Sequence, residues 1–456
     1  MEMIFLQLIV GGCFIGLIIV LFLEETDYLS YSILLVVIAS IATAIMKPSL
    51  IVGPGETGLE FFVGAINWEI IFFLISIFTI VQVLTEKKIF QKLALIIVEK
   101  NKENIRRLFY VFCIISTLSA AFIEDISVAL MFGPIILLAC KKLGINPAPF
   151  LLGMTITINL ASTLTPFGSA ENVLIADQIS ILGENPDELW FVTYLGIYFL
   201  GTTAITLYSL DRTIFSSEYK KPFSTTCELE TALQIKDLED MGDISRNSFI
   251  KNIIALFIFV FLLIIIPEIY IAGIIGMVIF IFLNPIENKK GKRKVALSHY
   301  LRELDYKLVY FFICLFIFVE LMEVNGTLNI FISIFQALPK QSEFLIALIV
   351  LLITSLLSGF MDNAPVTVIF IPIINSLITS GFGTNALVIA FVIGVNIGGN
   401  YLPQGSAADM ATLDISQRNC IVDLSFKRLF KVGSKYALLH ILIGIGYIAI
   451  ITLFFN

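Results

Sequence analysis

The sequence carries little charge and almost no histidine for its length. Of its 456 residues, 14% are Asp, Glu, Lys or Arg, 58% are hydrophobic, and only two are histidine. Soluble domains carry about 25% charged residues, so this composition excludes a soluble globular protein. Two histidines also give little support to a histidine-based metal centre.

Several chemical motifs are missing as well. The six cysteines form no CxxC pair and four of them lie in apolar stretches, which favours small buried side chains over a redox motif. There is no Walker A sequence for ATP and no HExxH zinc motif. The short basic loops are typical of topology signals rather than of a nucleic-acid surface. We therefore predict no enzyme, no cofactor and no nucleic-acid partner.

What the chain does have is a series of apolar segments of about 20 residues, the length needed to cross a bilayer. The runs are continuous rather than alternating, which excludes a β-barrel. We predict an all-α polytopic protein of the plasma or inner membrane, surrounded by the lipid bilayer. The expected spans are residues 4–23, 28–46, 66–84, 148–176, 189–209, 250–267, 269–284, 306–324, 384–412 and 435–455.

The chain repeats itself at a shift of about 238 residues. Trp68 to Phe73 returns as Tyr306 to Phe311, and NLASTLTPFGSAEN, from Asn159 to Asn172, returns as NIGGNYLPQGSAAD, from Asn396 to Asp409. Matching Gly, Pro and Asn breaks in two apolar halves are typical of secondary transporters. We therefore predict two repeats, each with five transmembrane helices, one of them broken, plus one helix pair.

Positive charge predicts how the helix pairs lie, because Lys and Arg mark the cytoplasmic side of a membrane. The pair at about 105–141 has Arg106 and Arg107 at its start and two lysines at its exit. Both ends then face the cytoplasm, which predicts a re-entrant hairpin. The pair at about 343–379 has no charge at its exit and is expected to open from the other side.

Each half crosses the membrane five times, which is an odd number, so the second repeat is expected to have the inverted orientation in the membrane. The predicted parts are the first repeat at 1–210 (hairpin 105–141, broken helix 148–176), a cytoplasmic linker at 211–249, and the second repeat at 250–456 (hairpin 343–379, broken helix 384–412).

Each break combines a proline, a glycine and a serine. Proline removes a backbone donor, glycine permits a sharp path, and serine is a preferred N-cap for the helix that follows. The matching residues are Pro166, Gly168 and Ser169 in the first break and Pro403, Gly405 and Ser406 in the second. We also expect Ser127 to cap the second arm of the first hairpin. Four half-helix N-termini would then converge near the midplane, where their partial positive charge favours an anion.

Five carboxylates lie in the same interruptions of the apolar runs. They are Glu124, Asp125, Glu171, Asp362 and Asp409. An ionisable side chain inside the membrane indicates function by default, as a cation ligand or a proton carrier. Glu171 also has a structural interpretation, as an acid that complements its helix dipole, because the matching residue of the second half is an alanine. Donor dipoles beside acidic groups predict a site for an anion and a coupling cation.

Two motifs in each half resemble those of the ion transporter superfamily. The tips Ser119–Asp125 and Ser358–Asn363 resemble its hairpin motifs, and the breaks Asn159–Asn172 and Asn396–Asp409 resemble its paired break motifs. The superfamily includes arsenite permeases, NhaD-type sodium/proton antiporters, the P protein, and citrate and dicarboxylate transporters. The resemblance implies re-entrant hairpins, a homodimer, and elevator-like movement of the domain that contains the hairpins.

The resemblance also carries site residues over by position. The implied substrate- or ion-binding residues are Glu124, Asp125, Ser127, Asn159, Thr163, Gly168, Ser169 and Asn172 in the first half, and Asp362, Asn363, Thr367, Asn396, Asn400, Gly405, Ser406 and Asp409 in the second. The candidate Na⁺ ligands among them are Asp125, Asn159, Asp362, Asn363 and Asn396. The tips lack the Ser-Asn-Thr of the dicarboxylate symporters, which argues against a close relative of that group.

These observations favour one function and leave alternatives open. We expect a secondary active transporter for a small anion or oxyanion, such as a carboxylate or arsenite, coupled to Na⁺ or H⁺. The main alternative is a Na⁺/H⁺ antiporter on the same fold, in which the carboxylates bind Na⁺ and protons in competition. An arsenite permease with a separate ATPase and an uncoupled channel also stay open.

Overall fold

The computed structural model describes most of the chain. The residues outside the description are 1, 22–26, 53–57, 102, 180–185, 223–244, 267, 288–292, 303, 305, 337–341, 383 and 455–456. Regular structure in the described residues is helical, apart from a pairing of β1 (Ile286–Glu287) with β2 (Arg293–Lys294). Within them, eight helices are long and apolar enough to cross a membrane. The prediction of an all-α polytopic membrane protein is confirmed.

The first half runs from α1 to α11. Its helices are α1 (Glu2–Leu21), α2 (Tyr28–Met46), α3 (Gly58–Gly64), α4 (Trp68–Glu86), α5 (Ile89–Asn101), α6 (Ile105–Ala120), α7 (Asp125–Leu143), α8 (Ala148–Ala161), α9 (Ala170–Gln178), α10 (Glu188–Leu210) and α11 (Ser216–Glu218), with a π-turn at Asp211–Phe215. The span expected at 148–176 is divided into α8 and α9, because Pro166 and its neighbours interrupt the helix.

The second half repeats this order. Its helices are α13 (Arg246–Ile265), α14 (Ile269–Leu283), α15 (Leu297–Arg302), α16 (Tyr306–Val324), α17 (Thr327–Gln336), α18 (Glu343–Phe360), α19 (Asn363–Thr379), α20 (Thr384–Gly398), α21 (Ala407–Arg418) and α22 (Phe426–Phe454). A 3₁₀ turn at Pro403–Gly405 lies inside the second break.

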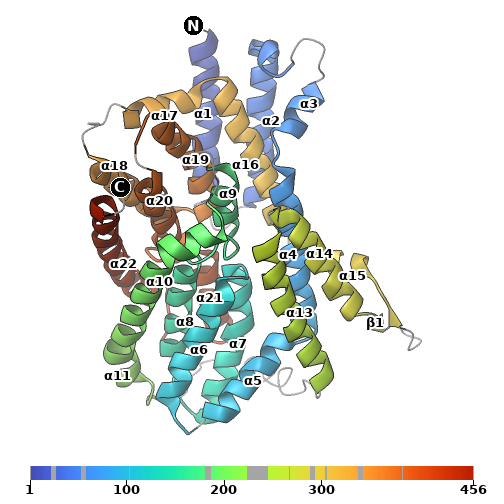
Figure 1. Cartoon of the computed structure of the whole chain (residues 1–456), viewed down its shortest axis with the longest axis vertical. Coiled ribbons are helices and arrows are strands. Elements are labelled where there is room, and N and C mark those ends of the chain that lie inside the picture. Colours follow the sequence, from blue (N-terminus) through green and yellow to red (C-terminus); the bar gives the residue numbers. More distant parts are fainter. Residues whose placement is uncertain are drawn as a thin grey trace.

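The two helix pairs lie toward opposite ends of the molecule. α6 and α7 lie with α5 at the lower end of Figure 1, whereas α18 and α19 lie with α17 toward its upper end. Within each half, the first arm of the pair packs against the first part of the broken helix, α6 on α8 and α18 on α20. The tips therefore approach the two breaks between these ends.

The early helices of each half pack against the other half. α2 packs on α16, and α14 packs on α4. α1 and α2 pack together, as do α13 and α14. These contacts between the halves join their early helices, including α4 and α16, into one packed domain.

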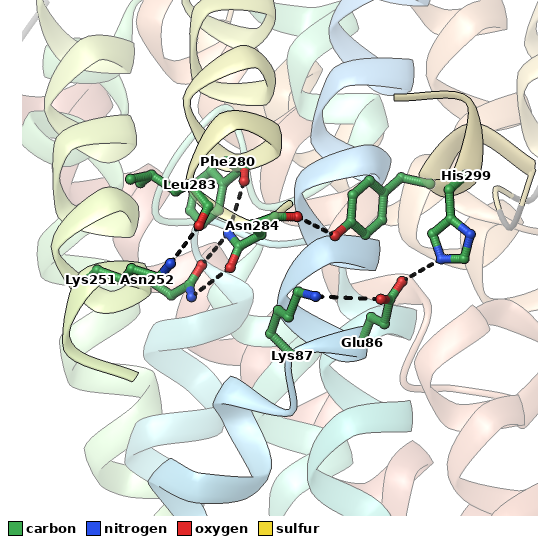
Figure 2. Close-up of polar contacts among 9 residues, drawn as sticks. Glu86, Lys87, Lys251, Asn252, Phe280, Leu283, Asn284 and His299 are labelled. Atoms are coloured by element: carbon green, nitrogen blue, oxygen red, sulfur yellow. Dashed lines mark hydrogen bonds and ion pairs between the residues drawn. The ribbon is translucent and has the colours of Figure 1, made fainter. Parts of the chain in front are cut away.

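Polar contacts attach α13, α14 and α15 to each other and to the end of α4 (Figure 2). Asn252 and Asn284 exchange two side-chain hydrogen bonds, at 3.0 and 2.7 Å, and Tyr300 Oη donates to the Asn284 carbonyl oxygen at 2.9 Å. His299 lies 2.8 Å from the Glu86 carboxylate. A buried amide without partners would be costly, so the reciprocal asparagine pair holds α13 and α14 in register.

The helices α3, α5, α15 and α17 were not predicted, and the start of the linker was placed inside a helix. α5 and α17 occupy segments between spans, and each precedes a helix pair and packs against its second arm, α7 or α19. Both are too short to cross a membrane, so a search for spans passes over them. The predicted linker begins inside a helix, because α10 continues through the π-turn into α11, and α13 already begins at Arg246.

Candidate functional site

A cavity of about 480 Å³ lies where the tips and breaks meet. One wall is built from the N-terminal turns of α7, α9, α19 and α21, so four half-helix N-termini border the same space. The opposite wall is mostly apolar and comes from α2, α4 and α16. Its side chains include Tyr28, Phe78, Val81, Gln82, Leu308, Phe311 and Phe312.

The described residues that line this cavity include four carboxylates and no basic side chain. The carboxylates are Glu124, Asp125, Glu171 and Asp362. Helix N-termini offer backbone N–H groups and partial positive charge to an anion, whereas carboxylates attract cations. An anion can therefore be accommodated here only together with cations or protons that offset the carboxylates.

The first tip places Glu124 and Asp125 at the start of α7. Glu124 is the N-cap residue, and Asp125 Oδ2 accepts a hydrogen bond from Ser162 Oγ at 2.8 Å. The prediction that Ser127 caps α7 is wrong, because the helix begins two residues earlier, at Asp125. Ser127 instead lines the cavity.

The second tip connects three elements through Asn363, the counterpart of Asp125. Asp362 caps α19, and its Oδ1 accepts a hydrogen bond from Asn363 N at 2.9 Å. Asn363 Oδ1 accepts a hydrogen bond from Ser358 Oγ at the end of α18, and Asn363 Nδ2 donates one to Glu171 Oε1 on α9 at 2.9 Å. Ser358 Oγ also donates to Val395 O of α20 at 2.5 Å. The second tip is thus bonded to both broken helices.

The serines of both breaks cap the helices that follow, as predicted. Ser169 Oγ accepts a hydrogen bond from Asn172 N, and Ser406 Oγ accepts one from Asp409 N, each at 3.4 Å. Both serines also line the cavity. The serine N-caps therefore place the first turns of α9 and α21 at the edge of the cavity.

The glycines of the breaks lie against the end of each hairpin's first arm. A Cβ atom at Gly168 would lie 2.8 Å from Ala120 O, and one at Gly405 would lie 2.7 Å from Ser358 O. These carbonyl oxygens occupy matching positions in the two halves. Glycine is required because the obstructing atoms belong to the backbone and cannot rotate away.

Buried amides join the broken helix of one half to that of the other. Asn159 Nδ2 donates to Asn400 Oδ1 at 2.9 Å and to Asp409 Oδ1 at 3.4 Å. In the matching contact, Asn396 Nδ2 donates to Asn172 Oδ1 at 2.9 Å. These side chains lie behind the cavity wall and support it, rather than lining it.

Three further predicted residues also lie away from the cavity. Asp409 is 1% exposed, and its Oδ1 accepts a hydrogen bond from Thr155 Oγ1 at 2.6 Å. Thr163, just beyond the end of α8, donates from Oγ1 to Leu160 O at 2.7 Å. Thr367 is buried on α19, and its hydroxyl has no hydrogen-bond partner among the described residues.

The candidate Na⁺ ligands divide between the cavity, which Asp125, Asp362 and Asn363 line, and the contacts between the two halves. Asp125 lies at the first tip and Asp362 and Asn363 at the second, whereas Asn159 and Asn396 take part in separate contacts between the halves. Within the described residues, no group of three or more Asp, Glu, His or Cys side chains could hold a metal. Two buried oxygens, Asp125 Oδ1 and Asn396 Oδ1, lack hydrogen-bond partners in the described part of the chain, which suits a monovalent cation ligand.

Glu171 lines the cavity but is not among the binding residues that the family resemblance implies. Its position two residues after the N-cap Ser169 is the sequence feature that could have identified it, because the first turn of α9 borders the cavity. Gln404 also lines the cavity and was not predicted.

Known proteins share this sequence pattern along most of the chain. The sequence profile of a family described as citrate transporter (CitMHS) matches residues 18–395 and 269–455. A 46 kDa membrane protein of Mycobacterium leprae is 25% identical over 77% of this chain and 79% of its own length. An uncharacterized transporter of Mycobacterium tuberculosis is 22% identical over 90% of this chain and 92% of its own length. The P protein of Mus musculus is 21% identical over 84% of this chain and 54% of its own length.

A solved structure has the same fold. The YdaH transporter of Alcanivorax borkumensis matches with a TM-score of 0.58 at 12% sequence identity, over 86% of this chain and 88% of that one. At this level of identity the match concerns the fold alone.

Proposed function

Because the chain belongs to the citrate transporter (CitMHS) family, we propose that it is a secondary active transporter of a small carboxylate anion, coupled to H⁺ or Na⁺. The family and the relatives place it among multi-pass membrane transporters rather than enzymes, and confirm the resemblance to the ion transporter superfamily. Citrate is the first candidate substrate. The observation that carries the proposal is a cavity bordered by four helix N-termini and four carboxylates.

The dimensions and polarity of the cavity support a small anionic substrate. Its volume of about 480 Å³ lies within the roughly 300–1,000 Å³ of small-molecule sites. Each helix N-terminus carries about half a positive charge, so four of them offer an anion about two charges without any Lys or Arg. The carboxylates on the same wall need protons or Na⁺ when the anion enters. This requirement links the two ligands, because each improves binding of the other.

The contrast between the walls supports an elevator-type movement. The tips and breaks form the polar wall, and α2, α4 and α16 present mainly apolar side chains to it. An apolar wall makes few directional contacts, so the polar wall can slide along it with its ligands. We propose that the helices carrying tips and breaks move as one body against α2, α4 and α16.

A Na⁺/H⁺ antiporter is the second candidate, favoured by one observation. The described lining holds four carboxylates without a basic side chain, and such a cavity also suits cations that compete with protons. In an antiporter, cations alone would move protons, and the helix N-termini would have no anion to bind.

Purified protein in liposomes loaded with a pH-sensitive dye separates the two candidates. We would add Na⁺, Li⁺ or K⁺ alone, and then each cation with citrate, succinate, sulfate or arsenite. Proton movement that requires one of the anions supports the proposed function and identifies the substrate class. Proton movement with cations alone supports the antiporter and contradicts the anion site. Asp414→Asn is the matched control, because Asp414 pairs with Arg418 away from the cavity.

A further inference from the structure

We propose that Gln82, on the apolar wall of the cavity, binds the transported anion, and that Glu320 takes its place when the site reaches the other end of the molecule. The inference rests on the proposed function, because it concerns the anion and the elevator-type movement described above. It adds a physical reason why the two faces of the transporter should bind the same anion with unequal affinity.

Gln82 lies on α4 and lines the cavity from the apolar wall. It shares one face of the helix with Phe78 and Val81, since residues three or four apart are neighbours on a helix surface. Its side chain is half-buried and makes no hydrogen bond to any residue in the described part of the chain. An amide that faces a cavity without a protein partner is available to a ligand.

The chemistry of the Gln82 amide suits a carboxylate ligand. Its nitrogen can donate two hydrogen bonds, and its oxygen can accept one from a hydroxyl group, so citrate offers partners to both ends. The helix N-termini contact the anion from the polar wall, and Gln82 can contact it from the opposite side. The apolar side chains beside Gln82 keep water away, which strengthens such a hydrogen bond.

The cavity lies against only one end of α4 and of α16. On α4 its lining residues end at Gln82, about one turn before the helix ends at Glu86. On α16 they begin at Leu308, within the first turn after Tyr306. The far half of each helix contributes no residue to the described lining.

These two helix ends lie at the same end of the molecule. α4 leads into α5 at the lower end of Figure 1, and α16 leads into α17 toward its upper end, so the two helices run in opposite directions. Lys87 and Lys88 directly follow α4, and basic residues predict the cytoplasmic side. The conformation described therefore holds the site at the end that is predicted to be cytoplasmic.

The sequence repeat identifies the matching positions at the other end. α4 and α16 have 19 residues each, and at the shift of 238 residues Val81 corresponds to Val319 and Gln82 to Glu320. Because the helices run in opposite directions, Glu320 lies toward the upper end of Figure 1, where α16 leads into α17. A polar wall that moves to this end would meet Val319 and Glu320 in place of Val81 and Gln82.

Gln82 and Glu320 offer an anion opposite chemistry. The amide can donate hydrogen bonds, whereas an ionised carboxylate can only accept them and repels a second negative charge. Glu320 is half-buried and forms no hydrogen bond or ion pair within the described residues. The protein should therefore hold the anion more tightly at the cytoplasmic end than at the other end.

Tracer uptake into right-side-out and inside-out membrane vesicles measures the apparent affinity at each face, with the anion that the liposome experiment identifies. Gln82→Leu should raise the KM at the cytoplasmic face by about tenfold, the loss expected for a hydrogen bond to a charged group, and leave the other face unchanged. Gln417→Leu is the matched control, because Gln417 is exposed at the end of α21 and does not line the cavity. Equal KM values of the two variants at the cytoplasmic face would overturn the role of Gln82.

Exchange of the two side chains tests the role of Glu320. The double variant Gln82→Glu/Glu320→Gln should reverse the ratio of the two KM values, so that the cytoplasmic face becomes the weaker one. Glu320→Gln alone should lower the KM at the other face, whereas the control Asp414→Asn should leave it unchanged. A double variant that keeps the wild-type ratio would refute the correspondence between Gln82 and Glu320.

Thiol labelling separates this inference from the proposed function. An impermeant thiol reagent should reach Gln82→Cys from the cytoplasmic face and Glu320→Cys from the other face, in each case above the labelling of the wild-type protein. Labelling of both variants from one face, or of Glu320→Cys from neither, would contradict the exchange of positions. A wild-type protein that transports no anion would refute the proposed function, whereas transport with unchanged KM values in Gln82→Leu would refute this inference alone.

Discussion

One added methyl group at Gly405 should separate the second break from the second hairpin. In Gly405→Ala, the new Cβ atom would lie 2.7 Å from Ser358 O and 2.9 Å from the carbonyl oxygen of Gly359. Both atoms belong to the backbone at the end of α18. No side-chain rotation can relieve the contact, so the break or the hairpin must shift.

The size of the effect follows from the geometry. Cβ atoms rarely come closer than about 3.0 Å to another heavy atom, so a shift of a few tenths of an ångström is required. Overpacking of this kind costs about 1–3 kcal/mol. Because 1–3 kcal/mol corresponds to about 5–150-fold in an equilibrium, we expect the population in which the second break packs against the second hairpin, and with it transport, to fall by about 5–150-fold.

Tracer uptake into proteoliposomes at equal protein content measures this effect. Gly446→Ala is the matched control, because a Cβ atom at Gly446 in α22 meets no atom within 4 Å. Gly168→Ala repeats the experiment in the first half, where the obstructing atom is Ala120 O. Gly405→Ala uptake equal to that of Gly446→Ala would refute the packing of break against hairpin described above.

Two further substitutions test contacts between elements. Asn67 Nδ2 at the start of α4 donates to Asp177 Oδ2 on α9 at 2.6 Å, and this hydrogen bond joins the two walls of the proposed elevator. Asp177→Ala should shift the conformational equilibrium by about tenfold, which thiol labelling of a cysteine placed at Ser127 would detect. Unchanged labelling would contradict a role of this hydrogen bond in the equilibrium. Arg106 pairs with Asp211, which is 1% exposed and also accepts hydrogen bonds from Tyr110 Oη and Ser216 Oγ. Arg106→Ala should destabilise the protein by about 1.5–3 kcal/mol in detergent unfolding, because it removes a charged donor from the buried carboxylate. Adding Asp211→Asn should recover most of the loss, and equal stability of both variants would contradict this explanation.

The sequence predicted the features that depend on neighbouring residues. α2 has the expected ends, and Ser169 and Ser406 cap their helices. Apolar length, proline and serine act within one or two turns of a helix, so no knowledge of the other half is needed. The position of the N-cap at the first tip was missed by a few residues, because Asp125 and Ser127 are both preferred N-cap residues, whereas the helix begins after Glu124, whose side chain makes no cap hydrogen bond.

The sequence could not show which way the acidic side chains point. Glu171 is two residues after the N-cap of α9, and Asp409 is three residues after that of α21. One residue rotates a helix by about 100°, so Glu171 faces the cavity and Asp409 faces Thr155 in the interior. The pairing of Glu171 with Asn363 crosses between the halves, and no spacing along the chain encodes such a contact.

The most direct test of the account is whether citrate binds to the purified protein together with protons. Titration calorimetry in buffers of different ionisation enthalpy counts the protons taken up per bound anion. We predict proton uptake on citrate binding, because the cavity carboxylates must be offset when the anion enters and each group that changes protonation contributes to the linkage. No binding of citrate, or binding without proton uptake at any pH or Na⁺ concentration, would contradict a cavity in which helix N-termini hold the anion while the carboxylates take up the protons.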